Sequence, residues 1–257
     1  MPDTDALASE LYTALRSHRP VEPLSARHPD LGLDEAYAIQ QRLVEMLVGG
    51  GDRVVGWKLG LTSKPMQNLL GVDQPDFSPI LQSMTRQDGA TIQMYDLIQP
   101  RVEAELTFVL GAPLVGPDVT AGDAAQAASG AAATLEVIDS RIIDWKIGLV
   151  DTVADLASGG AAVLSSQVPT GSWDPRLVGA AIYKNDELAA TGAGAAALGN
   201  PLEAVAWLAR TLSRWDAGLE AGQFVMTGSL HAAFPVEAGD SIRAEFDRIG
   251  SVAVEFA

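Results

Sequence analysis

Two glutamates lie two residues apart in a stretch with the alternation of a β-strand. In RVEAELTFVL (101–110), Glu103 and Glu105 would face one side, while apolar side chains face the other. The backbones of residues two apart on one strand face are separated by about 6.5–7 Å, and carboxylates at these positions repel each other unless a cation lies between them. Carboxylate oxygens suit Mg²⁺, Mn²⁺ or Ca²⁺. The pair therefore indicates either a divalent-metal site or a solvated strand face.

A third glutamate strengthens the metal hypothesis. Glu136 lies between apolar residues in TLEVIDSR, where an unpaired carboxylate would be costly to bury. A third oxygen ligand from a separate strand would complete one face of an octahedral site and leave positions open for water and substrate. Alternatively, Glu136 points to solvent or pairs with Arg141.

Two further residues could move protons. Lys58 lies in VVGWKLGLTS among apolar residues with glycines on both sides, and burial there would lower its pKa towards neutrality. A lysine that reaches solvent from a strand edge is the alternative. Asp76 lies in the turn-rich stretch GVDQPDFSPI, where it is either a partner in proton transfer or a turn former.

Composition narrows the protein class. The chain has 257 residues and a net charge of −16, which argues against nucleic-acid and anionic-membrane partners. The absence of cysteine excludes thiol catalysis, disulfides and metal–thiolate centres, and three scattered histidines argue against a multi-histidine metal site. No run of 18 apolar residues and no secretory leader stand out, so the expectation is a soluble, cytoplasmic protein.

Helical patterns flank and interrupt the segments that carry these residues. The pattern predicts a helix over 5–17, an irregular connector over 18–29, and a second helix with Asp34 as its N-cap that ends at the glycines 49–51. Two more helices are predicted at 122–129 and at 200–215, where Pro201 would occupy the first turn.

Strand patterns dominate after residue 52, at 53–61, 99–110, 133–139, 223–228, 240–246 and 251–256. The Ala/Gly-rich segment 189–199 is expected to be a surface turn and loop. The mixture predicts an α+β fold. We expect an N-terminal helical α/β part over 1–87 and a strand-rich catalytic domain over 88–257.

An ordered set of segments resembles the fumarylacetoacetate hydrolase superfamily. The segments run from about residue 34 to the C-terminus and are DEAYAIQQ, VVGWKLGLTSKPMQ, GVDQPDF, PRVEAELTFVL, LEVIDSRIIDWKIGLVDTVAD, GNPLEAVAWLA, LEAGQFVMTGS and AGDSIRAEFDRIGSVAVEF. Within the superfamily they are most similar to the hydratase/decarboxylase branch, which includes the 2-hydroxypenta-2,4-dienoate (2-keto-4-pentenoate) hydratases.

The resemblance implies roles for individual residues. Glu103, Glu105 and Glu136 would bind Mg²⁺ or Mn²⁺, and Lys58 and Asp76 would handle protons. The residues expected to contact the substrate are Leu61, Ser158, Gly228 and Ser229. Relatives usually have Asn where Leu156 stands, so this position implies an altered substrate, a repositioned amide or lost activity. His231 could approach the site, although an exposed loop position is the favoured interpretation.

The resemblance also implies a fold and an activity. The fold would be a mixed β-roll with a small N-terminal α/β part, assembled into a homo-oligomer and able to form a complex with a neighbouring pathway enzyme. The substrate would be a small anionic 2-oxo or 2-hydroxy acid. Hydration of a short 2-hydroxy-dienoate in the meta-cleavage catabolism of aromatic compounds is the main hypothesis. A 4-oxalocrotonate-type decarboxylase and a non-catalytic scaffold of the same fold are the alternatives.

Overall fold

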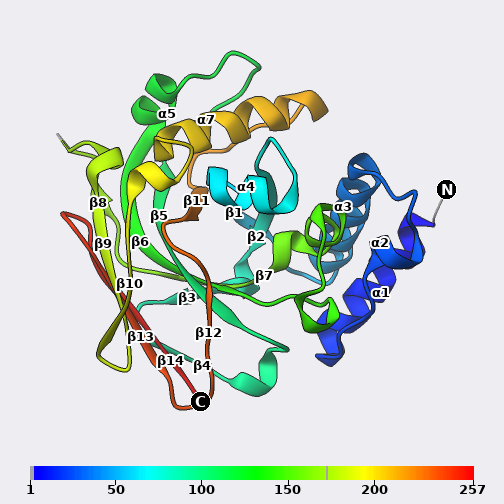
Figure 1. Ribbon diagram of the computed structural model, residues 1–257. Coiled ribbons are helices and arrows are strands. Elements are labelled where there is room, and N and C mark those ends of the chain that lie inside the picture. The colour runs from blue at the N-terminus through cyan, green and yellow to red at the C-terminus, as the bar shows by residue number, and fades with distance from the viewer. Residues whose placement is uncertain (1–2, 172) are drawn as a thin grey trace.

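Two β-sheets form the body of the molecule, and helices lie on the outside (Figure 1). The structure is a computed structural model that describes residues 3–171 and 173–257. It confirms the predicted α+β class. Among the described helices, none has the length and hydropathy that a membrane span requires.

The larger sheet carries all the candidate site strands. Its order is β2 (Asp76–Leu81), β1 (Val54–Gly60), β11 (Phe224–Ser229), β5 (Arg101–Leu110), β6 (Ala128–Ile138), β7 (Gly159–Leu164) and β3 (Thr85–Gln87). Two short strands extend it: β12 (Phe234–Pro235) pairs with β5, and β8 (Val168–Pro169) pairs with β6. Only the short 3-10 turn Gln82–Met84 separates β2 from β3, so the two edges of the sheet lie close together and the sheet curls into a roll.

The smaller sheet packs against β6 and β7. Its order is β10 (Glu187–Ala193), β9 (Gly179–Lys184), β13 (Ser241–Phe246), β14 (Gly250–Phe256) and β4 (Ala90–Ile92). The prediction of a loop over 189–199 is wrong for its first half, which forms β10. Small residues serve close packing there, because a Cβ at Gly192 would lie 2.3 Å from the carbonyl oxygen of Leu230.

A helical layer covers the roll beside β2. It consists of α1 (Thr4–Ser17), α2 (Leu24–Arg27), α3 (Leu33–Gly49) and α6 (Leu149–Ala154), which share a buried apolar cluster. Gly32, not Asp34, is the N-cap of α3. Asp34 lies in the first turn, where its carboxylate interacts favourably with the helix dipole. The expected connector 18–29 contains the short helix α2. Gln40 fixes the layer to the sheet by donating to the carbonyl oxygens of Phe77 and Val153.

Three more helices complete the fold. As predicted, α7 (Pro201–Leu212) begins with Pro201 in its first turn, and it packs on α5 (Ala121–Ala127) and β11. The third is α4 (Lys64–Leu70), which follows β1. The predicted strands are present, although β6 begins five residues earlier than expected. The large sheet draws strands from both sides of residue 87, and the division of the chain there stays a prediction.

The inner face of the roll is polar over one part of its strands and apolar over the next. Lys58 pairs with Ser78 across β1 and β2, and Glu105 pairs with Thr134 across β5 and β6. Further along the same strand faces, Ile80, Ala162, Phe224 and Met226 form a separate buried apolar cluster. One side of the polar residues is therefore closed by close packing.

Candidate metal centre

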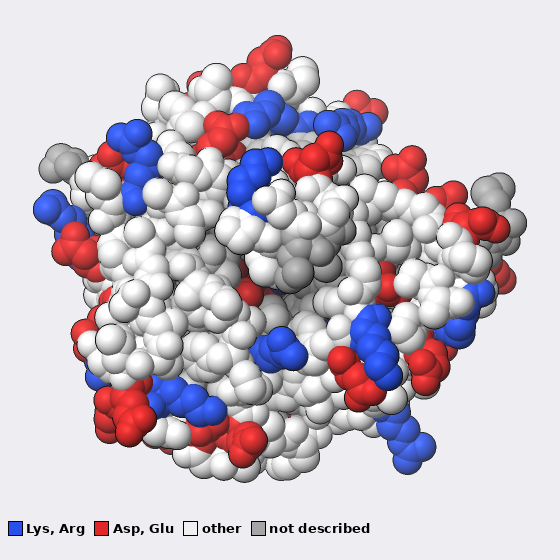
Figure 2. Space-filling model, in the orientation of Figure 1, with Lys and Arg blue, Asp and Glu red and all other residues white. Residues whose placement is uncertain are grey.

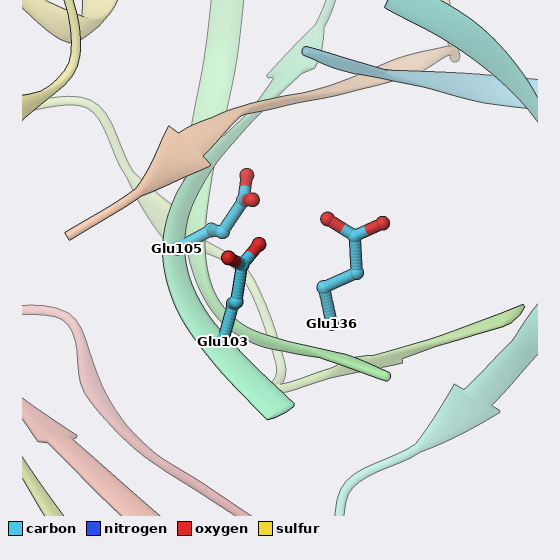
Figure 3. A group of neighbouring side chains, drawn as sticks. All are labelled: Glu103, Glu105 and Glu136. Atoms are coloured by element: carbon cyan, nitrogen blue, oxygen red, sulfur yellow. The ribbon is translucent and has the colours of Figure 1, made fainter. Parts of the chain in front are cut away.

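Three glutamates converge inside the roll. The register places Glu103 of β5 directly opposite Glu136 of β6, with Glu105 one inward-facing position further along β5. One carboxylate oxygen from each lies within 4.8 Å of the other two. Figure 3 shows the three side chains extending from their strands into a common space. The structure therefore brings together all three residues that the sequence suggested as metal ligands.

These carboxylates lack the partners that burial requires. Glu105 and Glu136 are buried. Among the described residues, Glu105 Oε1 and Glu136 Oε2 have no hydrogen-bond partner, and Glu136 Oε1 has only an ion pair with Lys58. Burial and the charge of Glu136 raise the pKa of Glu103 to about 7 and that of Glu105 well above its usual range. Buried polar groups are normally satisfied. A hard divalent cation would satisfy this all-oxygen set, so the residues fit such an ion.

Lys58 stands next to this centre. Its ammonium lies 2.8 Å from Glu136 Oε1 as an ion pair and donates to the carbonyl oxygen of Ala157, also at 2.8 Å. Burial alone would lower the pKa of Lys58, but the charges of Glu136, Asp76 and Glu103 outweigh it and raise the pKa. The expectation of a lowered lysine pKa is therefore wrong, because Lys58 is buried among acids rather than in an apolar pocket.

Asp76 completes the cluster from β2. It is the first residue of that strand, opposite Gly60, so the alternative that Asp76 is only a turn former is wrong. Pro79 within β2 obscured the strand pattern, and it is tolerated because β2 is an edge strand. Burial raises the pKa of Asp76 to about 6, with Lys58 opposing and Glu136 adding to the shift. Asp76 Oδ1 also lacks a hydrogen-bond partner among the described residues.

Two of the expected substrate contacts belong to the end of β11. The backbone N–H of Gly228 donates to Glu105 Oε2 at 2.7 Å, which orients that carboxylate. Gly228 has a φ of 106°, and a Cβ there would lie 2.0 Å from Thr62 Oγ1, so only glycine fits. The hydroxyl of Ser229 donates to the carbonyl oxygen of His231 at 2.5 Å. Both positions support the loop beside Glu105, and their contact with substrate stays a prediction.

The other two expected substrate contacts lie in strained backbone. Leu61, directly after β1, has a φ of 55°, and its carbonyl oxygen accepts from Gln67 Nε2. Ser158 is buried, has a φ of 55°, and its hydroxyl lies 3.2 Å from Thr152 Oγ1. Ser158 follows Ala157, whose carbonyl holds Lys58, so this turn borders the site.

Some functional features were not foreseen from the sequence. The ring of His231 is half-buried: Nε2 accepts from the N–H of Ala104 at 3.0 Å and Nδ1 meets the carbonyl oxygen of Ala232, so the expectation of an exposed loop residue is wrong. Leu156 is buried in the helical cluster. Arg141 pairs with Asp155 rather than with Glu136. No short sequence motif predicts the contacts of His231, Leu156 and Arg141, because they join segments that are separated in the chain.

The face in Figure 2 has a hollow near its centre, with acidic atoms inside it and a basic side chain at its edge. Elsewhere on this face, acidic and basic side chains are interspersed. A hollow with acidic atoms inside it is consistent with a site that takes a cation and a small ligand.

Known proteins are similar to this chain in sequence and in fold. Residues 63–257 match the family model described as Fumarylacetoacetate (FAA) hydrolase C-terminal. A 2-keto-4-pentenoate hydratase of Paraburkholderia xenovorans (strain LB400) is 44% identical over 97% of this chain and 93% of its own length. A 2-hydroxyhexa-2,4-dienoate hydratase of Comamonas testosteroni is 41% identical over 96% of this chain and 94% of its own.

A solved structure agrees over nearly the whole chain. The 4-oxalocrotonate decarboxylase from Pseudomonas putida G7, complexed with magnesium and adipate, superimposes with a TM-score of 0.96. It is 34% identical, and the match covers 99% of this chain and 97% of the decarboxylase chain. Sequence and fold lead to the same assignment: this chain belongs to the fumarylacetoacetate hydrolase family.

Proposed function

We propose that this protein is a divalent-metal-dependent hydro-lyase that adds water to a short 2-hydroxy-2,4-dienoate and gives a 4-hydroxy-2-oxo acid. The observation that carries the proposal is the cluster of three convergent glutamates with Lys58 and Asp76 beside it. The cluster occurs in a chain that is 44% identical to a 2-keto-4-pentenoate hydratase over almost its full length.

Glu103, Glu105 and Glu136 would hold the cation, which we propose to be Mg²⁺ or Mn²⁺. When bound, the cation would supply Lewis-acid chemistry that stabilises negative charge on the substrate. The site fits a cation because two buried oxygens, Glu105 Oε1 and Glu136 Oε2, have no partner among the described residues, and Glu136 Oε1 has only its ion pair with Lys58. The N–H of Gly228 keeps Glu105 aimed at the same point.

Lys58 and Asp76 are proposed to divide the proton transfers. The raised pKa of Lys58 keeps it an ammonium at neutral pH, so it donates a proton or stabilises negative charge on the substrate. Asp76, with a pKa of about 6, is mostly a carboxylate at pH 7 and can accept a proton. The two side chains lie on neighbouring inward-facing positions of β1 and β2.

The reaction then balances without a further reactant. Loss of the 2-hydroxyl proton and protonation of C5 convert the dienol into a conjugated 2-oxo-3-enoate. Water adds its oxygen to C4, and C3 takes up a proton as the enolate collapses to the 2-oxo group. The net change is the gain of one water. We propose that Leu61, Ser158, Gly228 and Ser229 line the bound acid.

The test uses metal-stripped protein and freshly prepared 2-hydroxypenta-2,4-dienoate. Loss of the diene's ultraviolet absorbance that depends on added Mg²⁺ or Mn²⁺, with a product heavier by one water, is the expected result. A folded, metal-binding protein that leaves the diene unchanged would contradict the hydratase proposal.

A second substrate and a stability measurement separate the hydratase from the decarboxylase and the scaffold. The structural similarity to a 4-oxalocrotonate decarboxylase makes release of carbon dioxide from 4-oxalocrotonate the necessary comparison. A scaffold without catalysis would leave both substrates unchanged and would gain no stability from Mn²⁺. The homo-oligomer and the complex with a pathway enzyme are further proposals, and sedimentation of the purified protein tests the first of them.

Asp76 is expected to set the acid limb of the pH profile. Because its carboxylate form accepts the proton and its pKa is about 6, kcat/KM should fall below about pH 6 and level off above it. Asp76→Asn should lower kcat by about 10²–10³-fold and remove that limb. Steady-state rates from pH 5 to 9, with Mn²⁺ kept saturating at every pH so that protonation of Glu103 and Glu105 does not empty the metal centre, measure both effects. An unchanged acid limb in Asp76→Asn would contradict the assignment.

Metal-free Asp76→Asn should also change stability in a defined direction. The folded pKa of about 6 lies above the usual 3.8, so the contribution of Asp76 to stability is full below about pH 3.8 and is lost as the pH rises through about 6. The variant should therefore unfold at a higher temperature than the wild type at pH 7–8, and the difference should vanish towards pH 4.

Gly60 is expected to be irreplaceable because of Asp76. A Cβ at position 60 would lie 2.1 Å from Asp76 Oδ1, so Gly60→Ala must displace that carboxylate. A displacement of a reacting group by about 1 Å can lower turnover by about 100-fold. Mn²⁺ binding should persist, because the glutamates are on other strands. Gly49→Ala is the matched control, since its added Cβ meets no atom within 4 Å among the described residues outside its own helix backbone and chain neighbours. Equal activity of the two variants would contradict the prediction.

A further inference from the structure

Three consecutive residues beside the site have left-handed backbone angles. The φ values of Leu156, Ala157 and Ser158 are 52°, 47° and 55°. Residues with a Cβ disfavour this region, and runs of them persist only where the surrounding structure holds them. The three residues form a short 3-10 turn, Leu156–Ser158, between α6 and β7. Some contact must therefore hold this turn in place.

A buried arginine spans the turn. Arg141 is 1% exposed, and its Nη2 donates to the carbonyl oxygen of Asp155 at 2.5 Å, just before the turn. Its Nη1 donates to the carbonyl oxygens of Gly159 at 2.6 Å, just after the turn, and of Asp139 at 2.5 Å. The planar guanidinium can bridge both ends of the turn at once, which a lysine ammonium cannot.

Asp155 locks the arginine in place. Its Oδ1 pairs with Arg141 Nε at 2.5 Å, and its Oδ2 accepts from the backbone N–H of Arg141 at 2.8 Å and from Ser140 Oγ at 3.2 Å. On the far side of the turn, the N–H of Asp139 donates to the carbonyl oxygen of Ser158 at 2.8 Å. The turn is thus held from both ends by groups within the protein.

The turn delivers one group to the site. The carbonyl oxygen of Ala157, its middle residue, accepts from Lys58 Nζ at 2.8 Å, while Glu136 Oε1 lies 2.8 Å from the same nitrogen. The ammonium is therefore fixed between an acid on β6 and a carbonyl of the turn. A turn that relaxed towards ordinary backbone angles would withdraw one of these two anchors.

We propose that the Arg141–Asp155 pair is a positioning element of the active site, which holds the left-handed turn so that the Ala157 carbonyl fixes the ammonium of Lys58. The proposal rests on the proposed function for its effect on turnover, but its structural part stands apart from it. Arg141 acts through Lys58 and does not contact the substrate, because it is buried and four of its five side-chain N–H groups already donate within the protein.

Arg141→Lys is the test, with two measurements. The chain has four lysines, so ¹⁵N-lysine labelling gives a simple spectrum in which Lys58 is identified by its absence from Lys58→Met. In the wild type, the buried, hydrogen-bonded ammonium of Lys58 should exchange slowly with water. Arg141→Lys has a fifth lysine, so its Lys58 resonance is identified by its absence from the double variant Arg141→Lys/Lys58→Met. In Arg141→Lys this resonance should shift and exchange faster, and kcat should fall by about 100-fold with little change in KM and in Mn²⁺ binding.

Arg210→Lys is the matched control. Arg210 also joins a carbonyl oxygen, that of Val119, and an acid, Glu203, but it lies on α7. Its replacement should leave kcat and the Lys58 resonance unchanged. Ala157→Gly supplies a rescue, since glycine adopts left-handed angles freely. Added to Arg141→Lys, it should recover about fivefold in kcat and restore part of the Lys58 signal.

The outcomes separate this proposal from the proposed function. A shifted Lys58 resonance with lower kcat and rescue by Ala157→Gly supports the positioning role. An unchanged Lys58 resonance in folded Arg141→Lys overturns it, whatever happens to turnover. If the wild type does not hydrate the dienoate, the proposed function fails, while the response of the Lys58 resonance still decides whether Arg141 positions Lys58.

Discussion

Replacing Glu105 with Gln is expected to abolish turnover and metal binding while making the metal-free protein more stable. Glu105 is fully buried beside Glu103 and Glu136, and its Oε1 has no partner among the described residues. Loss of an outer contact to a metal ligand already costs about 10–100-fold in affinity, so loss of a ligand should exceed 100-fold. A Lewis acid contributes several kcal/mol, which corresponds to a decrease of about 10³-fold or more in kcat.

The change in the stability of the metal-free protein shows whether Glu105→Gln loses turnover because it loses the metal. Without metal, the buried carboxylates repel one another, so a neutral amide at position 105 should raise the unfolding temperature. Added Mn²⁺ should stabilise the wild type and leave Glu105→Gln unchanged. Glu255→Gln removes an exposed glutamate from β14 and should behave like the wild type in every measurement. A less stable metal-free Glu105→Gln that still binds Mn²⁺ would refute the metal centre.

The spacing of the glutamates in the sequence predicts much of the metal centre. Period-two alternation places Glu103 and Glu105 on one face. The apolar neighbours of Glu136 imply that its carboxylate is buried and therefore needs a partner such as a cation. The alternation could not reveal that Glu136 stands opposite Glu103, because the register of β5 with β6 depends on long-range pairing. Nor could it show that Lys58 is surrounded by acids, which reversed the expected direction of its pKa shift.

Parts of the fold escaped prediction for similar reasons. The alanines and glycines of β10 have little intrinsic preference for strand, and they form one because β9 pairs with them. The left-handed turn at 156–158 carries no glycine to announce it. Its conformation depends on Arg141, which is 15 residues away from Leu156 in the chain and reaches the turn only in the folded protein. Helices with clear caps and periodicity, such as α7, were predictable from local sequence alone.

Charge inside the roll explains how an acidic protein can take an anionic substrate. Four carboxyl groups, those of Asp76, Glu103, Glu105 and Glu136, surround the single ammonium of Lys58. Such a site repels an acid until a divalent cation is bound. Substrate affinity should therefore depend on prior metal binding, and Lys58 should matter most for charge that develops on the substrate during the reaction.

Lys58→Met is expected to remove turnover without removing the metal. Loss of the ammonium should lower kcat by about 10³-fold, within the range for a group that transfers protons. Mn²⁺ should bind at least as tightly as in the wild type, because Glu136 Oε1 no longer pairs with Lys58 and the cation meets one competing charge fewer. Titration calorimetry with Mn²⁺ and steady-state rates measure the two effects. Lys184→Met, which removes a lysine paired with Asp240 away from the site, should change neither.

The contrast between Lys58→Met and Glu105→Gln separates two roles that turnover alone confuses. Without metal, Lys58→Met leaves the buried Glu136 without its cation and should unfold at a lower temperature than the wild type. Mn²⁺ replaces that missing charge, so the rise in unfolding temperature on adding Mn²⁺ should be larger than in the wild type. Glu105→Gln should show the opposite pattern, a more stable metal-free protein without a response to Mn²⁺. If Lys58→Met instead lost Mn²⁺ binding, Lys58 would be needed to build the metal centre, and its assignment to proton transfer would be wrong.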